Sequence, residues 1–416
     1  MLDEQVRHSP LIDSEKNIYI MTTTRLRKFT PLGSLTWTFE QTGKMTTSPT
    51  LHGDVIYLLS GVEGGIDVYA LNILNASIVW KVHMPDRAIN GDSQSLMFIK
   101  DRLIAPASID YFNADNAWLA LNASTGAYLW DYVTDEIFWN AAPTALDDSL
   151  LFSASCGAAF RISLDGKTLW KAGEHHPGFC GTGGGSLGEN GVFYAEYSAP
   201  DASGTFNGHL AAYRVSDGHK LWEKNFGPRY LGNQYPSVGR LGPNGKLAVV
   251  VAIGENPGLP LLGLDALANH RERYFTDLEY RMSLGAKPQV NAVLALDAET
   301  GDQIWRWEEK RWAHFGAAGD EEGFLDRVTH PSIEGPICLP DLQGIPVTNS
   351  FDGTVFASSS HNGNLTAIND ANGDGIIDKS EIKSFAPHSA FLNSPSMAPG
   401  MIVAAPCWGP TYVWVD

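Results

Sequence analysis

The chain has 416 residues, of which 44% are hydrophobic and 18% are charged, a composition typical of a folded globular protein with a large core. Its formal net charge of −18 disfavours nucleic acids and anionic membranes as partners, because an acidic surface repels both. The longest apolar run, LAVVVAI at 247–253, is too short to cross a bilayer, so the sequence predicts no membrane span.

Two features bear on the compartment in which the protein works. The N-terminal segment MLDEQVRHSPLIDSEKN contains no hydrophobic signal stretch. We favour a secreted or periplasmic location, which suits the acidic composition of a mature chain, and a cytoplasmic location stays open. Four cysteines lie far apart without CxxC spacing, which argues against a zinc ribbon or a c-type haem site. One or two disulfides and buried single thiols are both compatible with this spacing.

A repeated template runs along the chain, and each copy has a short strand, a Gly or Asn turn and a strand that carries Trp. The copies are SLTWTF (34–39), ALNILNASIVWKV (70–82), ALNASTGAYLWDY (120–132), ISLDGKTLWKA (162–172), AYRVSDGHKLWEK (212–224) and ALDAETGDQIWRW (295–307). Short strands at intervals of about 40–50 residues, with no long helix between them, are typical of propeller blades. A large aromatic at a fixed position would fill the wedge between neighbouring blades.

A second marker precedes these copies and recurs eight times, from HSPLIDSEKNIYIMT (8–22) to NSPSMAPGMIVAAP (393–406). It consists of a small-residue entry, a turn and an alternating apolar strand. We therefore predict an all-β protein in which residues 1–416 form a single eight-bladed β-propeller with Trp docking motifs. The eighth unit has no Trp-bearing last strand, and we expect the N-terminal MLDEQVRH to supply or cover its open edge.

One segment departs from the strand pattern. Between 258 and 288, apolar residues recur at helical spacing, namely Leu264, Leu267, Tyr274, Leu278 and Met282. We expect a partly helical insertion in blade six, packed over one end of the propeller.

The repeat A-L-D-A-x-T-G-x-x-x-W, present here as ALDAETGDQIW (295–305), resembles the pyrroloquinoline quinone (PQQ) repeat of quinoprotein alcohol dehydrogenases. The same repeat occurs in cofactor-free relatives that act as assembly scaffolds. The resemblance covers essentially the whole chain, and blade six is most similar to polyvinyl-alcohol dehydrogenase. It implies the PQQ-like propeller fold, and it leaves both uses open because one fold hosts both.

The resemblance also implies an axial site. In the enzymes PQQ lies at the propeller axis beside a Ca²⁺ held by a Glu, an Asn and an Asp, and the Asp acts as the base. The matching positions are Asn256 in IGENPG, Asp326 in FLDRVTHPS, and Glu196 or Asp201 in VFYAEYSAPD. His361, in SSSHNGN, stands where the family has a cofactor-binding Lys.

Several parts of that site are missing. Glu255 replaces the Gly that precedes the family's Asn-Pro, and Asn233-Gln234-Tyr235 stands where a Trp would floor the quinone. DASGTFNGHL (201–210) has neither the vicinal Cys pair nor the Arg of the polyvinyl-alcohol dehydrogenase branch, and no haem motif is present. We therefore favour a degenerate or non-catalytic propeller that binds a protein partner through one face. The alternative is a PQQ- and Ca²⁺-dependent dehydrogenase of a small alcohol, with Asp326 as base.

NDANGDGIIDKSE (369–381) matches an EF-hand-like calcium loop, and it lies in the turn between the third and fourth strands of blade seven. Gly375 permits the sharp turn, and Ile377 is the apolar residue that such loops place inward. The predicted ligands are the side chains of Asp370, Asn372, Asp374, Asp378 and Glu381 and the backbone carbonyl of Ile376. No entering helix precedes the loop, so we expect a structural Ca²⁺ clamp instead of a sensor that opens.

Overall fold

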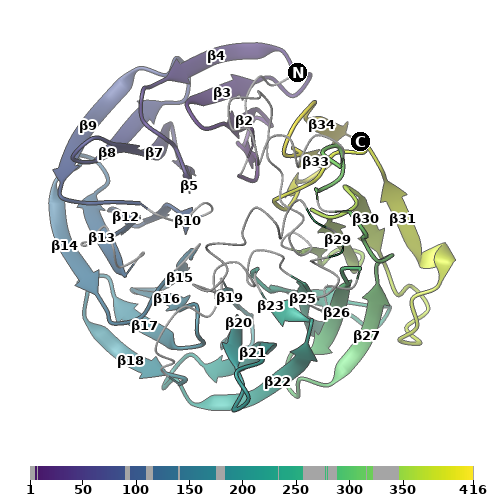
Figure 1. Cartoon of the computed structure of the whole chain (residues 1–416). Helices are drawn as coiled ribbons and strands as arrows, with labels where there is room; N and C mark the ends of the chain where they lie inside the picture. The colour runs from purple at the N-terminus through teal and green to yellow at the C-terminus, as the bar shows by residue number, and fades with distance from the viewer. Residues whose placement is uncertain are drawn as a thin grey trace.

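The computed structural model describes residues 5–6, 8–89, 94–108, 116–138, 141–174, 183–232, 234–255, 277, 279, 288–314, 316–321 and 346–415. Eight sheets are arranged radially around one axis, which is the predicted eight-bladed propeller (Figure 1). In each blade the strands form an antiparallel meander, with the first strand innermost and the last strand at the rim. The predicted insertion at 258–288 lies outside the described residues, apart from Asp277, Glu279 and Pro288.

The first four blades take up the N-terminal half of the ring. Blade 1 contains β1 (Leu11–Ile12), β2 (Ile18–Met21), β3 (Arg25–Phe29) and β4 (Leu35–Glu40). Blade 2 contains β6 (Thr50–His52), β7 (Val55–Val62), β8 (Gly65–Asn72) and β9 (Ile78–Pro85). Blade 3 contains β11 (Met97–Ile99), β12 (Arg102–Ala107), β13 (Ala117–Asn122) and β14 (Tyr128–Val133). Blade 4 contains β15 (Thr144–Leu146), β16 (Ser149–Ser153), β17 (Ala159–Ser163) and β18 (Thr168–Ala172). A short parallel pair, β5 (Thr47–Ser48) with β10 (Gln94–Ser95), lies toward the axis.

The last four blades complete the ring. Blade 5 contains β19 (Gly184–Leu187), β20 (Val192–Pro200), β21 (Phe206–Arg214) and β22 (Lys220–Pro228). Blade 6 contains β23 (Leu231–Gly232), β24 (Ser237–Leu241), β25 (Lys246–Gly254), β26 (Asn291–Asp297) and β27 (Gln303–Glu308). Blade 7 contains β28 (Val347–Asn349), β29 (Thr354–Ser358), β30 (Leu365–Ile368), the 3₁₀ turn η2 (Lys379–Glu381) and β31 (Ile382–Phe385). In the described part of the chain, blade 8 contains β32 (Ser396–Ala398), β33 (Met401–Ala404) and β34 (Tyr412–Val415).

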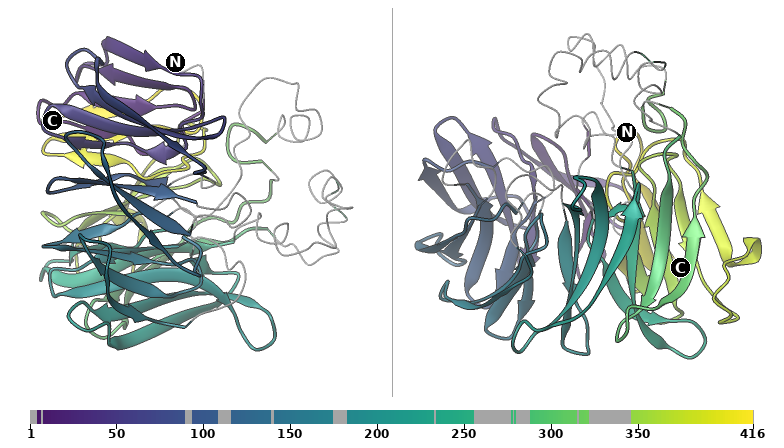
Figure 2. Two further views of the ribbon diagram at one scale, coloured as in Figure 1. Left: turned by 90° about the vertical axis from the view of Figure 1, so that its left-hand side faces the viewer. Right: turned by 60° about the horizontal axis from the view of Figure 1, so that its bottom comes forward.

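The meander gives the ring two different ends. Turns between first and second strands and between third and fourth strands lie at one end, which we term the hairpin end. Connections between second and third strands, and the links from blade to blade, lie at the other, which we term the link end. Figure 2 shows the blades stacked around the ring in two further orientations. These two ends separate the candidate sites described below.

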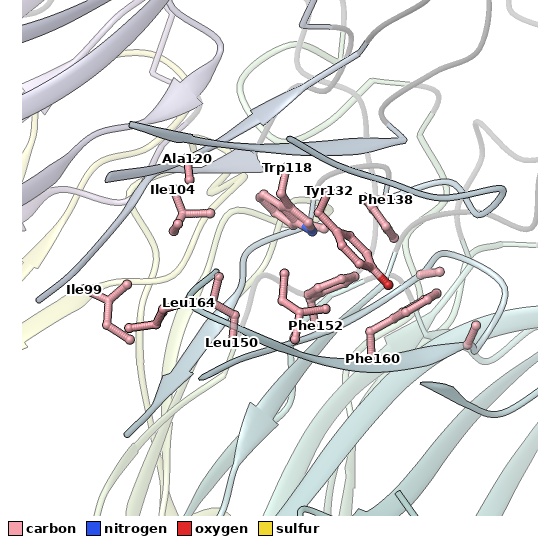
Figure 3. Packing of buried hydrophobic residues seen from close by; sticks show 14 residues of the cluster. Ile99, Ile104, Trp118, Ala120, Tyr132, Phe138, Leu150, Phe152, Phe160 and Leu164 are labelled. Atoms are coloured by element: carbon pink, nitrogen blue, oxygen red, sulfur yellow. The ribbon is translucent and has the colours of Figure 1, made fainter. Parts of the chain in front are cut away.

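Each interface between neighbouring blades is filled by large apolar side chains, because a twisted sheet must bury both of its faces. Between blades 3 and 4, for example, Trp118, Phe138, Phe152 and Phe160 are all buried and pack against one another (Figure 3). The rings of Trp118 and Phe152 meet edge to face, with centroids 5.6 Å apart. Such contacts between aromatic rings add to the gain from burial alone.

The tryptophans of blades 1 to 5 dock each of their outer strands onto the next blade. The Trp130 indole N–H in β14 donates a hydrogen bond of 2.8 Å to the carbonyl of Leu164, in the third-to-fourth-strand turn of blade 4. Its ring covers Gly166 of that turn so closely that a Cβ there would lie 2.9 Å from the indole. Equivalent indole bonds join Trp37 to Ile73 (2.9 Å), Trp80 to Ala123 (2.9 Å), Trp170 to Val215 (2.8 Å) and Trp222 to Ala298 (3.3 Å). This confirms the predicted packing role of the Trp stripe.

The ring closes between blades 8 and 1 through the N-terminal segment. The backbone N–H of Val6 donates to the carbonyl of Cys407 (3.1 Å), and Val6 also pairs with Thr22 beyond β2. The Ser9 and Ser394 hydroxyls lie 3.0 Å apart. The described N-terminal residues thus lie inside the joint and leave the outer edge of β34 uncovered. Residues 1–4 and 7 lie outside the described residues, so the prediction that MLDEQVRH supplies or covers that edge stays a prediction.

Candidate functional site

Glu196 is the one predicted axial residue whose side chain the structure describes as buried without a partner. It lies in β20, paired with Gly184 of β19 and Leu210 of β21. Alternation along the strand puts it on the same face as Tyr194, which packs against blade 6. The side chain is 0% exposed, and neither carboxylate oxygen has a hydrogen-bond partner.

A glycine on blade 6 makes room for this carboxyl group. Gly232 of β23 lies directly over Glu196, and a Cβ at that glycine would be 2.6 Å from the glutamate Cγ. The Ser198 hydroxyl donates to the Gly232 carbonyl (2.8 Å), which fixes β23 against β20. Burial raises the pKa of the Glu196 carboxyl well above its ordinary value, because the charged form loses its hydration. Burial without a partner therefore favours the neutral acid of this side chain over the carboxylate.

Asp201, the other carboxylate candidate, has a structural role in a surface turn. It accepts hydrogen bonds from the Ser203 hydroxyl and from the backbone N–H groups of Ser203 and Thr205. These bonds lower the pKa of Asp201 to about 2. Because Asp201 is exposed and engaged in its own turn, Glu196 is the better match to the carboxylate that the resemblance implies. The other two axial candidates, Asn256 and Asp326, lie outside the described residues.

His361 lies in a buried polar network at the link end of blades 6 and 7. Its Nδ1 is 2.7 Å from the Asn291 amide nitrogen, and His361 is only 1% exposed. Asn291 also approaches Glu309 (3.4 Å), and the Ser359 hydroxyl donates to the same Glu309 oxygen (2.9 Å). The sequence analysis did not single out Asn291, Glu309 or Ser359. Only the pairing of blades brings them together, since Asn291 and His361 are 70 positions apart.

Glu255, which departs from the family's Gly, has a clear structural function. Its carboxylate forms a two-pronged ion pair with Arg229, at 2.6 Å from Nε and 2.8 Å from Nη2. It also accepts the backbone N–H of Val290 (3.0 Å), while Arg229 donates to the Pro288 carbonyl (2.9 Å). These contacts tie the end of β25 to the start of β26 and to the link that leaves β22. The position therefore stabilises blade 6 at its link end.

The predicted calcium loop occupies the turn between β30 and η2, at the hairpin end and at the rim (Figure 1). Asp370 is 4% exposed, and its carboxylate accepts the N–H groups of Gly373 (2.9 Å) and Gly375 (3.2 Å). Gly375 has a φ of +77°, the left-handed conformation that favours glycine. Ile377 packs on the blade 6–7 core, as predicted for the inward apolar residue.

The far side of the loop closes on itself. Asp378 and Glu381 form a capping box around η2, with Glu381 also accepting the Ala371 N–H (3.1 Å). The oxygen-only donor set fits Ca²⁺, which prefers carboxylate and carbonyl oxygens. Within the described part of the chain, however, no three carboxylate, imidazole or thiolate side chains already converge on one metal position. Binding would require the loop's carboxylates to turn from its backbone amides toward the ion.

The loop also replaces a docking turn. Gly375 is the counterpart of Gly166 in blade 4, and a Cβ on it would lie 2.7 Å from the Ile304 carbonyl oxygen of β27. Gly373 similarly closes on Pro243, which follows β24. Trp305, the Trp of blade 6, is 1% exposed at this interface. The loop is therefore part of the joint between blades 6 and 7 and is remote from the link end.

Cys156 and Cys407 are both disulfide-bonded. The cysteine spacing was compatible both with disulfides and with single thiols. None of the described cysteines is a free thiol. No helix in the described part of the chain is long and apolar enough to cross a membrane.

These features define an eight-bladed propeller of PQQ-type repeats. A family model described as outer membrane protein assembly factor BamB matches residues 4–136 and 111–254. These matches extend over more than half of the chain, so the chain belongs to this family. The comparison with curated proteins found no matching sequence.

Solved structures agree on the fold. BamB from Moraxella catarrhalis is 15% identical with a TM-score of 0.62, over 100% of this chain and 95% of that chain. The quinohemoprotein alcohol dehydrogenase from Comamonas testosteroni is 12% identical with a TM-score of 0.61, over 99% of this chain and 74% of that chain. A europium-containing methanol dehydrogenase is 15% identical with a TM-score of 0.53, over 88% and 76%. At such identities the likeness shows the fold alone.

Proposed function

We propose that this chain is a calcium-binding, non-catalytic propeller that binds a protein partner. The chain belongs to a family described as an outer membrane protein assembly factor, which makes partner binding the first function to consider. The observation that carries the proposal is the environment of His361. At the position where the resemblance implies a Lys that contacts the cofactor, the side chain is buried and held by Asn291 in a network with Glu309. Held in this network, the imidazole of His361 does not offer the ammonium group with which a Lys would contact the cofactor.

The test is titration of the purified protein with PQQ and Ca²⁺, followed by removal of free quinone. We expect no quinone absorbance on the protein and no dye reduction with small alcohols. Retained quinone together with alcohol-driven dye reduction would contradict the proposal of a non-catalytic, partner-binding propeller. The matched variant is His361→Lys, which restores the family's residue type, and under the proposal it too fails to retain quinone.

The state of Glu196 favours a second candidate, the PQQ- and Ca²⁺-dependent dehydrogenase of a small alcohol. A buried carboxyl without a partner fits a ligand whose cation has not been supplied. In that case Glu196, Asn256 and Asp326 would hold the metal. When bound, Ca²⁺ supplies polarisation of the quinone carbonyl. Asp326 would accept the proton of the alcohol hydroxyl, and Gly232 would keep the carboxyl of Glu196 within the blade 5–6 interface.

The proposal places the protein outside the cytosol and assigns Ca²⁺ a structural role. Disulfides at Cys156 and Cys407 are typical of oxidising compartments, which supports a secreted or periplasmic location. In such compartments Ca²⁺ is abundant, and the loop at 369–381 would hold it between blades 6 and 7. Mass spectrometry of the non-reduced protein tests the first part: free thiols at both cysteines after isolation would contradict it.

A further inference from the structure

Among the described residues, blade 8 has no counterpart of the strand that forms the docking joint in the other blades. In the seven other blades the outermost strand pairs with the one before it and packs against the next blade. In blade 8 the outermost strand is β34, and no described residue pairs with its second edge. Unpaired backbone N–H and C=O groups along such an edge are a template for another strand.

The register of blade 8 shows where a fourth strand would place its aromatic residue. In blade 2, Val55 pairs with Asn72, and Ala70 two positions before Asn72 pairs with Trp80. In blade 8 the counterpart of Val55 is Met401, which pairs with Val415. Val413, two positions before Val415, is therefore the counterpart of Ala70. Val413 is partly buried against blade 1. An incoming strand would therefore set its aromatic residue opposite Val413, facing blade 1.

Blade 1 has a turn of the kind that receives a docked Trp elsewhere, here termed the seat, and no described residue covers it. Gly33 precedes Trp37 by four positions, as Gly166 precedes Trp170, and its φ of +81° matches the +73° of Gly166. A Cβ built on Gly166 meets the docked Trp130 at 2.9 Å, whereas a Cβ on Gly33 meets no described atom within 4 Å. The two turns also share their backbone bonds, since each glycine N–H donates to the carbonyl three positions earlier.

The described parts of this chain do not fill the seat. Val6 is held at the Cys407 carbonyl and at Thr22. The edge of a second copy would fit poorly, because the residues of β34 that face blade 1 are Val413 and Val415. Trp414 points the other way and packs on Phe385 of blade 7, with ring centroids 5.1 Å apart.

We infer that the edge of blade 8 accepts an extended segment of a partner protein that carries an apolar residue followed by Trp. The incoming strand lies antiparallel to β34, and its Trp covers Gly33. Other outer strands here show the pattern, as in Ile-Val-Trp-Lys (78–81) and Thr-Leu-Trp-Lys (168–171). The net charge of −18 favours a basic segment over an acidic one. This inference deepens the proposed partner-binding role and rests on it.

The test uses the full chain and a synthetic peptide with the sequence of residues 77–85, SIVWKVHMP. We expect saturable one-to-one binding by fluorescence anisotropy, and hydrogen–deuterium exchange that slows at β34 when the peptide is added. Replacing the peptide's Trp80 by Ala should weaken binding by about 30-fold or more, as for a central aromatic anchor. Absence of binding at millimolar peptide, or an equal affinity of the Ala peptide, would overturn the inference.

Protein variants locate the seat. Gly33→Asn places a side chain under the incoming Trp, and Asn tolerates positive φ, so the turn persists. Gly64→Asn is the control, because Gly64 has a φ of +78° and equally open surroundings away from the edge. We expect loss of peptide binding only in Gly33→Asn. Equal binding by both variants would refute the seat.

Other occupants of the edge give different results. Protection of the β34 amides from exchange without peptide, or a dimer that dissociates when peptide is added, would show that the chain itself or a second copy occupies the edge, and would overturn the inference of a partner strand. Quinone titration reports on the axial site alone, so failure of one proposal is distinguishable from failure of the other.

Discussion

Replacing Glu196 by Gln tests a feature of the interface between blades 5 and 6, a buried carboxyl without a hydrogen-bond partner. The unfolded chain releases this proton near the ordinary Glu pKa of about 4.3. The folded chain holds it to higher pH, because burial raises the pKa. Between the two pKa values the unfolded state binds fewer protons, so the free energy of unfolding falls as pH rises. The slope from this one group approaches about 1.4 kcal/mol per pH unit.

The assay is urea unfolding from pH 4.5 to 8.5 in EDTA, for the wild type and for Glu196→Gln. We expect the stability of the variant relative to the wild type to increase with pH, because Gln does not titrate. Glu299→Gln, at an exposed turn position, is the control and should keep the wild-type pH dependence. Parallel curves for the wild type and Glu196→Gln would refute the placement of the carboxyl in an unpartnered, buried site.

The same experiment separates the two candidate functions. With PQQ and Ca²⁺ present, a cation at the axis would keep Glu196 ionised in the folded state and lower its pKa. The stability that depends on this group would then rise with pH, opposite in sign to the behaviour in EDTA. Glu196→Gln and the wild type both retain the loop in blade 7, so calcium bound there cancels in the comparison.

Three further predictions concern the joints and the polar network. Asp370→Ala should abolish the rise in melting temperature that Ca²⁺ gives the wild type, a gain of about 2.7 kcal/mol at a hundredfold excess over Kd; calorimetry with and without the ion checks this, and equal gains would contradict the clamp. Trp130→Phe removes the indole bond to Leu164 and should lower the free energy of unfolding in urea by about 1–2 kcal/mol; an unchanged midpoint would argue against the docking bond. Asn291→Leu takes a partner from buried His361 and should cost about 1–3 kcal/mol, measured in the same way, and a neutral effect would show that the network contributes little.

The fold was predictable because its determinants are local and repeat. A residue with positive φ four positions before a Trp marks both halves of a docking joint; it is Gly in most copies and Ala76 in blade 2, while most other positions differ. The place of the segment 369–381 in the turn between the third and fourth strands of blade 7 was predictable for the same reason, since all of its residues are contiguous, and its binding of Ca²⁺ stays a prediction. The inward position of Ile377 followed from the motif alone.

The link-end site was less predictable because its contacts join blades. Asn291 and His361 are distant in sequence, and neither stands in a motif that announces the other. Glu255 was visible only as a departure from the family, while its contact with Arg229 depends on how two strand ends meet. The disulfide state of Cys156 is likewise a matter of spatial proximity. Glu196, by contrast, was reached through the family resemblance, which left Asp201 as the alternative carboxylate in VFYAEYSAPD.

The docking joints have a consequence for how such a ring can change over evolutionary time. Because blades 1 to 5 each present a Trp on one side and a turn of the same kind on the other, the docking contact itself sets no order among them. Duplication or loss of one of these units leaves every remaining joint matched, which makes them interchangeable modules. The joint between blades 6 and 7 is different, since Gly373 and Gly375 fit Pro243 and Ile304 specifically. Those two blades are expected to be inherited together, as one unit of two.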